Sequence, residues 1–299
     1  MKKIQFFLFV LSFQAFNAQI DPIKFPTYTS VEDAKKSKEK IFSLSFREKG
    51  LFNVPPEITD FQEVFFLNFM GNNLEKMDEK IFSLKKLEYL YLNKNGIKYI
   101  PDNIAELTQL KEFFMNLNAL TEVNPNLAKL QNLEVIYLDA NNLSVFPEAL
   151  IEIKNLKEIN LQGNQISFIP ENLDKIKELK YLNLSMNQIN DLENVNFPKK
   201  LKYIELQENA IINLPKSLLK LKDLEFLNLS NNNIESLPSY IRQLENVESI
   251  NLANNKLSLI PEEVSSLKNL KTLILTGNPI DKKSIENLKS SMPQTQIYF

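Results

Sequence analysis

Apolar residues recur along this chain with a period of 23 residues. The first apolar position of each unit falls at Ile41, Val64, Leu87, Leu110, Leu133, Leu156, Leu179, Leu201, Leu224, Val247 and Leu270, with only the step to Leu201 one residue shorter. Positions 1, 4, 6 and 11 of these eleven units give 44 sites, and every one is apolar. A fixed period of this length predicts a solenoid in which each unit stacks on its neighbours.

Each unit is expected to contain one short strand and one return segment. Positions 4 and 6 are two residues apart, which is strand spacing, so odd positions face away from the interior. Position 15 is often proline, as at Pro101, and proline suits the first residue of a helix or 3-10 turn because it has no amide hydrogen. Apolar pairs at helical spacing follow, such as Ile104 and Leu107. These pairs predict short helices that pack inward.

Position 9 is asparagine in every unit but the first, which has Lys49. A polar side chain at a fixed place beside the core must be hydrogen-bonded. We expect each asparagine to bond the backbone where the chain leaves the strand, and so to link successive turns, rather than to bind a ligand. This structural Asn ladder comprises Asn72, Asn95, Asn118, Asn141, Asn164, Asn187, Asn209, Asn232, Asn255 and Asn278.

The pattern resembles the leucine-rich repeat proteins of the 23-residue class with Leu-Pro in the convex half, which includes plant Ras-group and animal Ras-scaffold proteins. The resemblance covers about residues 41–280. It implies an α/β solenoid, a right-handed superhelix or horseshoe of about eleven repeats. A parallel sheet would line its concave side, and short helices or 3-10 turns its convex side. It also implies a non-catalytic protein-binding role.

The two ends of the chain are expected to differ from the repeats. Residues 1–18 have the charged start, apolar stretch and small residue of a signal peptide, with an ordinary core strand as the alternative. Residues 19–40 are predicted to form an N-terminal cap with a short helix that opens at Ser30 and runs to about Lys38. Residues 281–299 are predicted to form a C-terminal cap, in which Ile285 and Leu288 indicate an amphipathic helix before a final strand.

Odd strand positions form the surface that leucine-rich repeat proteins generally use for binding. At position 5, Tyr91, Phe114 and Tyr137 follow one another, so they should form an aromatic row spanning about 10 Å. We expect these rings to be exposed side by side, as an interaction site would require; cross-strand stabilisation of the sheet is the alternative. The predicted partner-binding residues are Phe66, Met70, Tyr89, Tyr91, Phe114, Tyr137, Tyr181, Tyr203 and Phe226.

The amino-acid composition excludes most kinds of catalytic and metal-binding site. The chain has no histidine and no cysteine, which removes the usual general base, the common nucleophile pairs and nearly every zinc site. Two carboxylates could in principle hydrolyse a glycoside, but Glu112 and Glu158, which share a column, lie two strands apart. We therefore expect no enzymatic activity, no cofactor and no metal. The concave face is mildly acidic, which does not suit nucleic acid.

Two functions from different classes remain. The favoured one is a bacterial exported scaffold that binds a protein or peptide and is expected to be a monomer. The alternative is a carbohydrate- or cell-surface-binding adhesin that uses the same face for a glycan. Absence of cysteine departs from the disulfide-closed caps of animal and plant extracellular relatives and favours a bacterial protein. No membrane segment is expected after signal cleavage, and a cytoplasmic location is the alternative to export.

Overall fold

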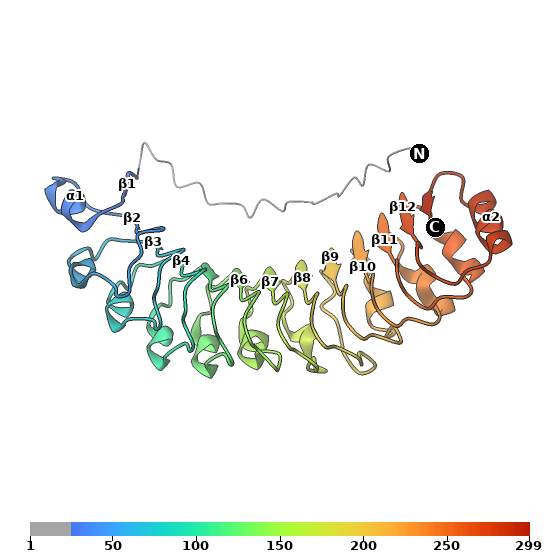
Figure 1. Cartoon of the computed structure of the whole chain (residues 1–299), viewed down its shortest axis with the longest axis horizontal. Helices are drawn as coiled ribbons and strands as arrows, with labels where there is room; N and C mark the ends of the chain where they lie inside the picture. Colours follow the sequence, from blue (N-terminus) through green and yellow to red (C-terminus); the bar gives the residue numbers. More distant parts are fainter. Residues whose placement is uncertain (1–24) are drawn as a thin grey trace.

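The computed structural model describes residues 25–299, which form a curved solenoid. Within this part of the chain, thirteen strands make one parallel sheet, and each strand pairs with its neighbours in sequence. The sheet lines the inner side of the arc and the 3-10 helices lie on the outer side (Figure 1). The signal peptide predicted at residues 1–18 lies outside the described residues.

Eleven of the strands come from the repeats and occupy positions 3 to 5 of each unit. The strands are β1 Thr27–Tyr28, β2 Ser43–Ser45, β3 Phe66–Asn68, β4 Tyr89–Tyr91, β5 Glu112–Phe114, β6 Val135–Tyr137, β7 Glu158–Asn160, β8 Tyr181–Asn183, β9 Tyr203–Glu205, β10 Phe226–Asn228, β11 Ser249–Asn251, β12 Thr272–Ile274 and β13 Gln296–Tyr298. Neighbouring strands pair position 5 with position 5, so side chains at one repeat position stand in a column across the sheet.

Short 3-10 helices form most of the convex side. They are η1 Pro56–Asp60, η2 Glu79–Ser83, η3 Asp102–Glu106, η4 Pro125–Lys129, η5 Glu148–Glu152, η6 Leu173–Lys175, η7 Leu218–Lys220, η8 Ser239–Gln243 and η9 Glu262–Ser266. Pro101 was predicted to be the first residue of a helix, but it lies immediately before η3. Its carbonyl accepts a hydrogen bond from Ile104 N at 3.0 Å. Proline can hold this place because its fixed φ leads the chain into the turn while its carbonyl remains free to accept.

The repeat positions predicted to be apolar fill the interior. All side chains at positions 1, 4, 6 and 11 are buried except Leu51 and Ile280, which lie in the first and last units. Each buried leucine or isoleucine contributes about 1.5–3 kcal/mol relative to an exposed one. Unit seven has no 3-10 helix between β8 and β9, yet its Val195 and Phe197 are buried and continue the core. The shortened unit therefore changes the convex path without opening the interior.

The position-9 asparagines bond backbone groups of two successive units. Asn141 is typical: its Oδ1 accepts from Leu120 N at 3.0 Å, and its Nδ2 donates to Met115 O and Leu138 O at 3.0 and 2.9 Å. Leu120 and Met115 belong to the preceding unit. These side-chain bonds add to the backbone hydrogen bonds that continue between turns beyond the strands, such as Leu138 N to Asn160 O at 2.9 Å.

Position 8, just after each strand, has a left-handed backbone in all eleven units, with φ between 52° and 75°. Glycine occupies this position in only three units, at Gly71, Gly163 and Gly277. Elsewhere the conformation falls on residues such as Leu117 and Met186. A side chain in this region costs roughly 1–2 kcal/mol, so the tight exit from the strand is maintained against local strain.

Two helices and two strands close the ends of the described solenoid. Helix α1 spans Val31–Lys36, and the Ser30 hydroxyl caps it by accepting from Asp33 N. Helix α2 spans Lys282–Ser291 and buries Ile285 and Leu288, after which β13 pairs with β12. Strand β1 pairs with β2 and has no counterpart in the predicted elements. These additions extend the sheet by one strand at each end.

Candidate functional site

The aromatic row, which we define as Tyr91, Phe114 and Tyr137, stands on the concave sheet. Pairing of β4, β5 and β6 puts these three residues in register. The ring centroids of Tyr91 and Phe114 are 4.5 Å apart at an interplanar angle of 6°, and those of Phe114 and Tyr137 are 4.7 Å apart at 8°. The spacing of parallel strands has therefore set three rings face to face, as stacked plates.

Stacking corrects the expectation that all three rings are open to solvent. Phe114 is only 9% exposed because a tyrosine ring covers each of its faces. Tyr91 and Tyr137 are half-buried. The row thus presents ring edges rather than ring faces on the concave side, and stacking of its rings stabilises the sheet across strands.

Aromatic side chains extend the row toward the N-terminal end of the solenoid. Phe66 lies against Tyr91 with centroids 5.2 Å apart in an edge-to-face arrangement, and Tyr89 lies 6.4 Å from Phe66. Phe42 and Phe65, which are absent from the predicted site, continue this cluster, because Phe65 lies 6.4 Å from Tyr89 and 6.1 Å from Phe42. Both occupy position 2, which is Lys or Glu in every later unit. This departure from the repeat pattern could have identified the two residues from the sequence.

The second predicted patch occupies the opposite half of the face. Tyr181, Tyr203 and Phe226 are in register at position 3 of successive units and all are half-buried. They are separated from the aromatic row by Glu158 and Asn160 of β7. The concave face therefore has two aromatic areas rather than one continuous surface.

Each tyrosine hydroxyl in these two areas, apart from that of Tyr89, donates a hydrogen bond to a glutamate of the next unit. The pairs are Tyr91 with Glu112 at 2.7 Å, Tyr137 with Glu158 at 3.0 Å, Tyr181 with Glu205 at 2.9 Å and Tyr203 with Glu225 at 2.6 Å. A hydroxyl that donates to a charged oxygen makes a short, strong bond. These bonds fix the orientation of both partners and make the face rigid.

Burial shifts the titration of this face. It is the main factor that raises the pKa of Glu112 and of Glu158, although the Tyr91 and Tyr137 hydroxyls oppose the shift. Burial also raises the pKa of the tyrosines Tyr91 and Tyr137. The tyrosines consequently remain neutral donors near pH 7.

Position 7 forms a polar column beside the aromatic row. Three of its side chains have a buried oxygen without a hydrogen-bond partner among the described residues: Asn93 Oδ1, Asp139 Oδ1 and Gln207 Oε1. Burial raises the pKa of Asp139 to about 6, against an opposing hydrogen bond from Asn116. Met70, the predicted site residue in this column, is half-buried.

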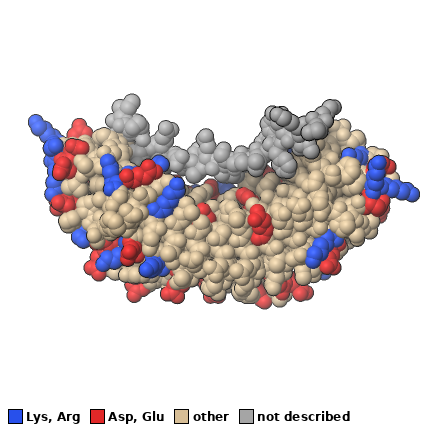
Figure 2. Space-filling model, in the orientation of Figure 1, with Lys and Arg blue, Asp and Glu red and all other residues tan. Residues whose placement is uncertain are grey.

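From unit two onward, the charged side chains at the concave strand positions are all acidic. Positions 3, 5 and 7 of units two to eleven contain Glu112, Asp139, Glu158 and Glu205 and neither Lys nor Arg. On the side of the molecule drawn in Figure 2, by contrast, basic and acidic residues are mixed and form no large patch of one sign. The acidic character of the inner sheet therefore does not extend to this side of the molecule.

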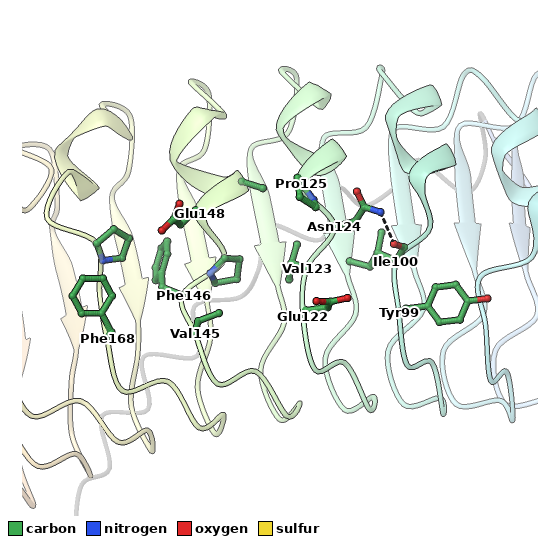
Figure 3. Close-up of a pocket in the computed structure, with 13 residues that line it drawn as sticks. Tyr99, Ile100, Glu122, Val123, Asn124, Pro125, Val145, Phe146, Glu148 and Phe168 are labelled. Atoms are coloured by element: carbon green, nitrogen blue, oxygen red, sulfur yellow. Dashed lines mark hydrogen bonds between the residues drawn. The ribbon is translucent and has the colours of Figure 1, made fainter.

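A second apolar surface lies away from the inner sheet, where the chain of units three to six passes toward the convex side (Figure 3). Tyr99, Val145 and Phe168, all at position 13, are 50%, 58% and 59% exposed and line a groove of about 540 Å³. Glu122 and Glu148 are its only charged lining residues among the described part of the chain. This groove is absent from the predicted site, although its apolar residues occupy a repeat position that is mainly polar in the other units.

The acidic residues of this face do not gather into a single cluster. Among residues 25–299, no cluster of acidic residues is arranged to hold a metal ion. Glu112 and Glu158 are each bonded to a tyrosine and belong to strands separated by β6. Within the same residues, no helix has the length and apolar character needed to span a bilayer.

Comparisons with known proteins agree with this architecture. Families described as "Leucine rich repeat" match residues 108–166, 177–234 and 246–267, and "Leucine Rich repeats (2 copies)" matches residues 154–196. A leucine-rich repeat protein of Leptospira interrogans is 35% identical with a TM-score of 0.80; the match covers 87% of this chain and 66% of that protein. The chain thus spans just under two thirds of that relative's length.

Two further structures share the fold. An internalin, InlF, of Listeria monocytogenes is 21% identical with a TM-score of 0.70, and the match covers 85% of this chain and 79% of that one. The plant peptide hormone receptor RGFR1, solved in complex with RGF2, is 25% identical with a TM-score of 0.70, covering 83% of this chain and 41% of the receptor. Comparison with curated proteins gave no match.

A repeating strand, an asparagine ladder and a concave sheet define a solenoid of the binding-scaffold type. The chain belongs to the leucine-rich repeat family. Membership and the structural neighbours support a protein-binding scaffold in general, and proteins of this fold are generally non-catalytic.

Proposed function

We propose that this protein is an exported scaffold that binds a protein or peptide through its concave face, with the aromatic row and its neighbours Phe66, Met70 and Tyr89 as the main contact. Tyr181, Tyr203 and Phe226 form a second contact area. The observation that carries the proposal is a half-buried aromatic surface held rigid by tyrosine–glutamate bonds. Rigid aromatic side chains lose little entropy on binding and act as anchors.

The stacking geometry favours a polypeptide over the alternative, a carbohydrate- or cell-surface-binding adhesin. A sugar ring packs against an open aromatic face, whereas both faces of Phe114 are covered by Tyr91 and Tyr137. Ring edges and glutamate oxygens instead match the apolar side chains and N–H donors of a polypeptide. Competition by soluble sugars, together with indifference to protease treatment of the target, would favour the adhesin.

Export is part of the proposal and rests on the signal-peptide pattern of residues 1–18. The N-terminus of the protein recovered from its native source tests this point. Export predicts a chain that starts near Gln19. An intact N-terminus on protein from the cytoplasm would contradict export and favour the cytoplasmic alternative.

The concave contact is tested by capturing a partner with the purified protein and measuring its affinity for matched variants. The double variant Tyr91→Ala with Phe114→Ala should weaken binding by more than about thirtyfold, since two anchor residues are lost. The control, Tyr99→Ala with Phe168→Ala, removes the same two residue types from the groove of Figure 3 and should leave affinity unchanged.

A second variant guards against loss of folding, because Phe114 is buried. Met70→Arg adds a charge beside the row without emptying the core, and it should also weaken binding. If both variants fold and bind the partner as tightly as the wild type does, the proposal that the partner binds the concave face is wrong.

A further inference from the structure

Asp139 differs from the other concave carboxylates in its bonding. Glu112, Glu158 and Glu205 each accept a hydrogen bond from a tyrosine hydroxyl. Asp139 is half-buried, and its Oδ1 has no hydrogen-bond partner among the described residues. Asn116 donates a hydrogen bond to this carboxylate, so Oδ1 is the oxygen that lacks a donor. A charged oxygen buried without a donor is unfavourable, and a ligand that donates to it would relieve that cost.

The surroundings of Asp139 supply no cation. Its neighbours in the position-7 column are Asn116 and Gln162, which are amides. Arg47, the one basic residue at position 7, lies four units away and forms an ion pair with Glu48 at 3.1 Å. A ligand cation would therefore meet no basic competitor in this part of the face.

A second acceptor without a partner lies in the same column. Asn93 is only 8% exposed, and its Oδ1 has no hydrogen-bond partner in the described part of the chain. Asn93 and Asp139 are two repeats apart, which corresponds to about 10 Å across the sheet. Three residues of an extended polypeptide span this distance at about 3.3 Å per residue.

We infer that Asp139 binds a cationic side chain, an arginine guanidinium or a lysine ammonium, of an extended polypeptide lying along the aromatic row, while Asn93 accepts a neutral donor about three residues away in the same ligand. This inference rests on the proposed function. A guanidinium or ammonium group supplies the donor that Asp139 Oδ1 lacks and neutralises its charge. The apolar part of the same side chain would lie against the edge of Tyr137.

The inference predicts that binding depends on pH. Burial raises the pKa of Asp139 to about 6, so the ionised fraction falls about tenfold between pH 7 and pH 5. The titratable groups on adjoining strands are Glu112 of β5, Tyr137 of β6 and Glu158 of β7, and their pKa values are also raised. The profile of an Asp139→Asn variant separates the contribution of Asp139 from theirs.

The test uses acetyl-arginine amide and its neutral analogue acetyl-citrulline amide as probes of the full chain. Titrations are followed through the carbon resonances of labelled aspartate carboxyl groups. The arginine probe should shift the Asp139 resonance saturably at pH 7, bind about tenfold tighter than citrulline, and bind about tenfold more weakly at pH 5. Asp139→Asn should abolish the preference for arginine, and Asp223→Asn, at an exposed site outside the concave face, should retain it.

Equal binding of the two probes, or an arginine preference that survives Asp139→Asn, would overturn the inference. The substitution is isosteric and removes a buried charge, so the variant is expected to fold. A partner that depends on the aromatic row but ignores Asp139→Asn would refute this inference alone. An arginine probe that binds at Asp139, combined with a partner that ignores the row, would refute the proposed function instead.

Discussion

Removing one asparagine of the ladder should destabilise the solenoid far more than removing its neighbour in sequence. Asn141 is buried, and its side chain makes hydrogen bonds of 3.0 Å or less with three backbone groups, whereas the adjacent Asn142 is exposed. The pair Asn141→Ala and Asn142→Ala therefore makes the same chemical change in two environments one residue apart.

The expected magnitude follows from which groups lose their last partner. Met115 O also accepts from Asn118, and Leu138 O also accepts from Asn164, so each carbonyl keeps one bond in Asn141→Ala. Leu120 N loses its side-chain acceptor. One orphaned N–H costs about 1–3 kcal/mol and each lost bond about 0.5–1.5 kcal/mol, which gives roughly 2–6 kcal/mol in total.

Urea unfolding followed by circular dichroism measures this difference, with hydrogen exchange of the Leu120 amide as a local probe. Asn142→Ala should remain within about 0.5 kcal/mol of the wild type. If the two variants unfold at the same urea concentration, the ladder does not hold successive turns together and the reasoning fails.

Three further predictions concern charge and backbone conformation. Burial raises the pKa of Asp139 from 3.8 to about 6, so its ionisation destabilises the fold increasingly between these pH values and fully above about pH 6. Asp139→Asn should therefore stabilise the protein by up to about 3 kcal/mol at pH 7. Thermal unfolding should show this advantage vanishing as the pH falls toward 4. Leu117→Gly should stabilise by about 0.5–1 kcal/mol, since φ is 56° there and the side chain is 44% exposed; a lower midpoint in urea would contradict this. Gly277→Ala should destabilise the protein by at least about 1 kcal/mol more than Gly163→Ala. A Cβ added at Gly277 would lie 2.1 Å from Asn254 Oδ1, whereas one added at Gly163 would have its nearest contact at 3.7 Å. Equal melting temperatures of the two variants would contradict this prediction.

The architecture could be predicted from sequence because the period fixes which side chains are inside. Once Leu90 and Leu92 occupy the core face, Tyr91 must point to the concave side, and identical spacing in each unit puts the columns in register. Helix α1 could be expected because the Ser30 cap is local to its segment.

The details of the binding face could not be predicted in this way. Burial of Phe114 depends on the rotamers of Tyr91 and Tyr137, which a column assignment leaves open. The tyrosine–glutamate bonds follow no single rule of repeat positions. A tyrosine at position 5 bonds a glutamate at position 3, whereas a tyrosine at position 3 bonds a glutamate at position 5 or position 2. The pairs therefore cannot be identified from a fixed sequence separation. Strand β1 lies outside the repeat and is formed by only two residues, too few for a pattern.

The most direct test of the concave contact is hydroxyl-radical footprinting of aromatic side chains with and without the captured partner. Tyr91 and Tyr137 should become protected in the complex, whereas Tyr99 and Phe168, in the groove of Figure 3, should react as before. Protection of Tyr99 and Phe168 with none at Tyr91 and Tyr137 would show that the molecule binds its partner elsewhere.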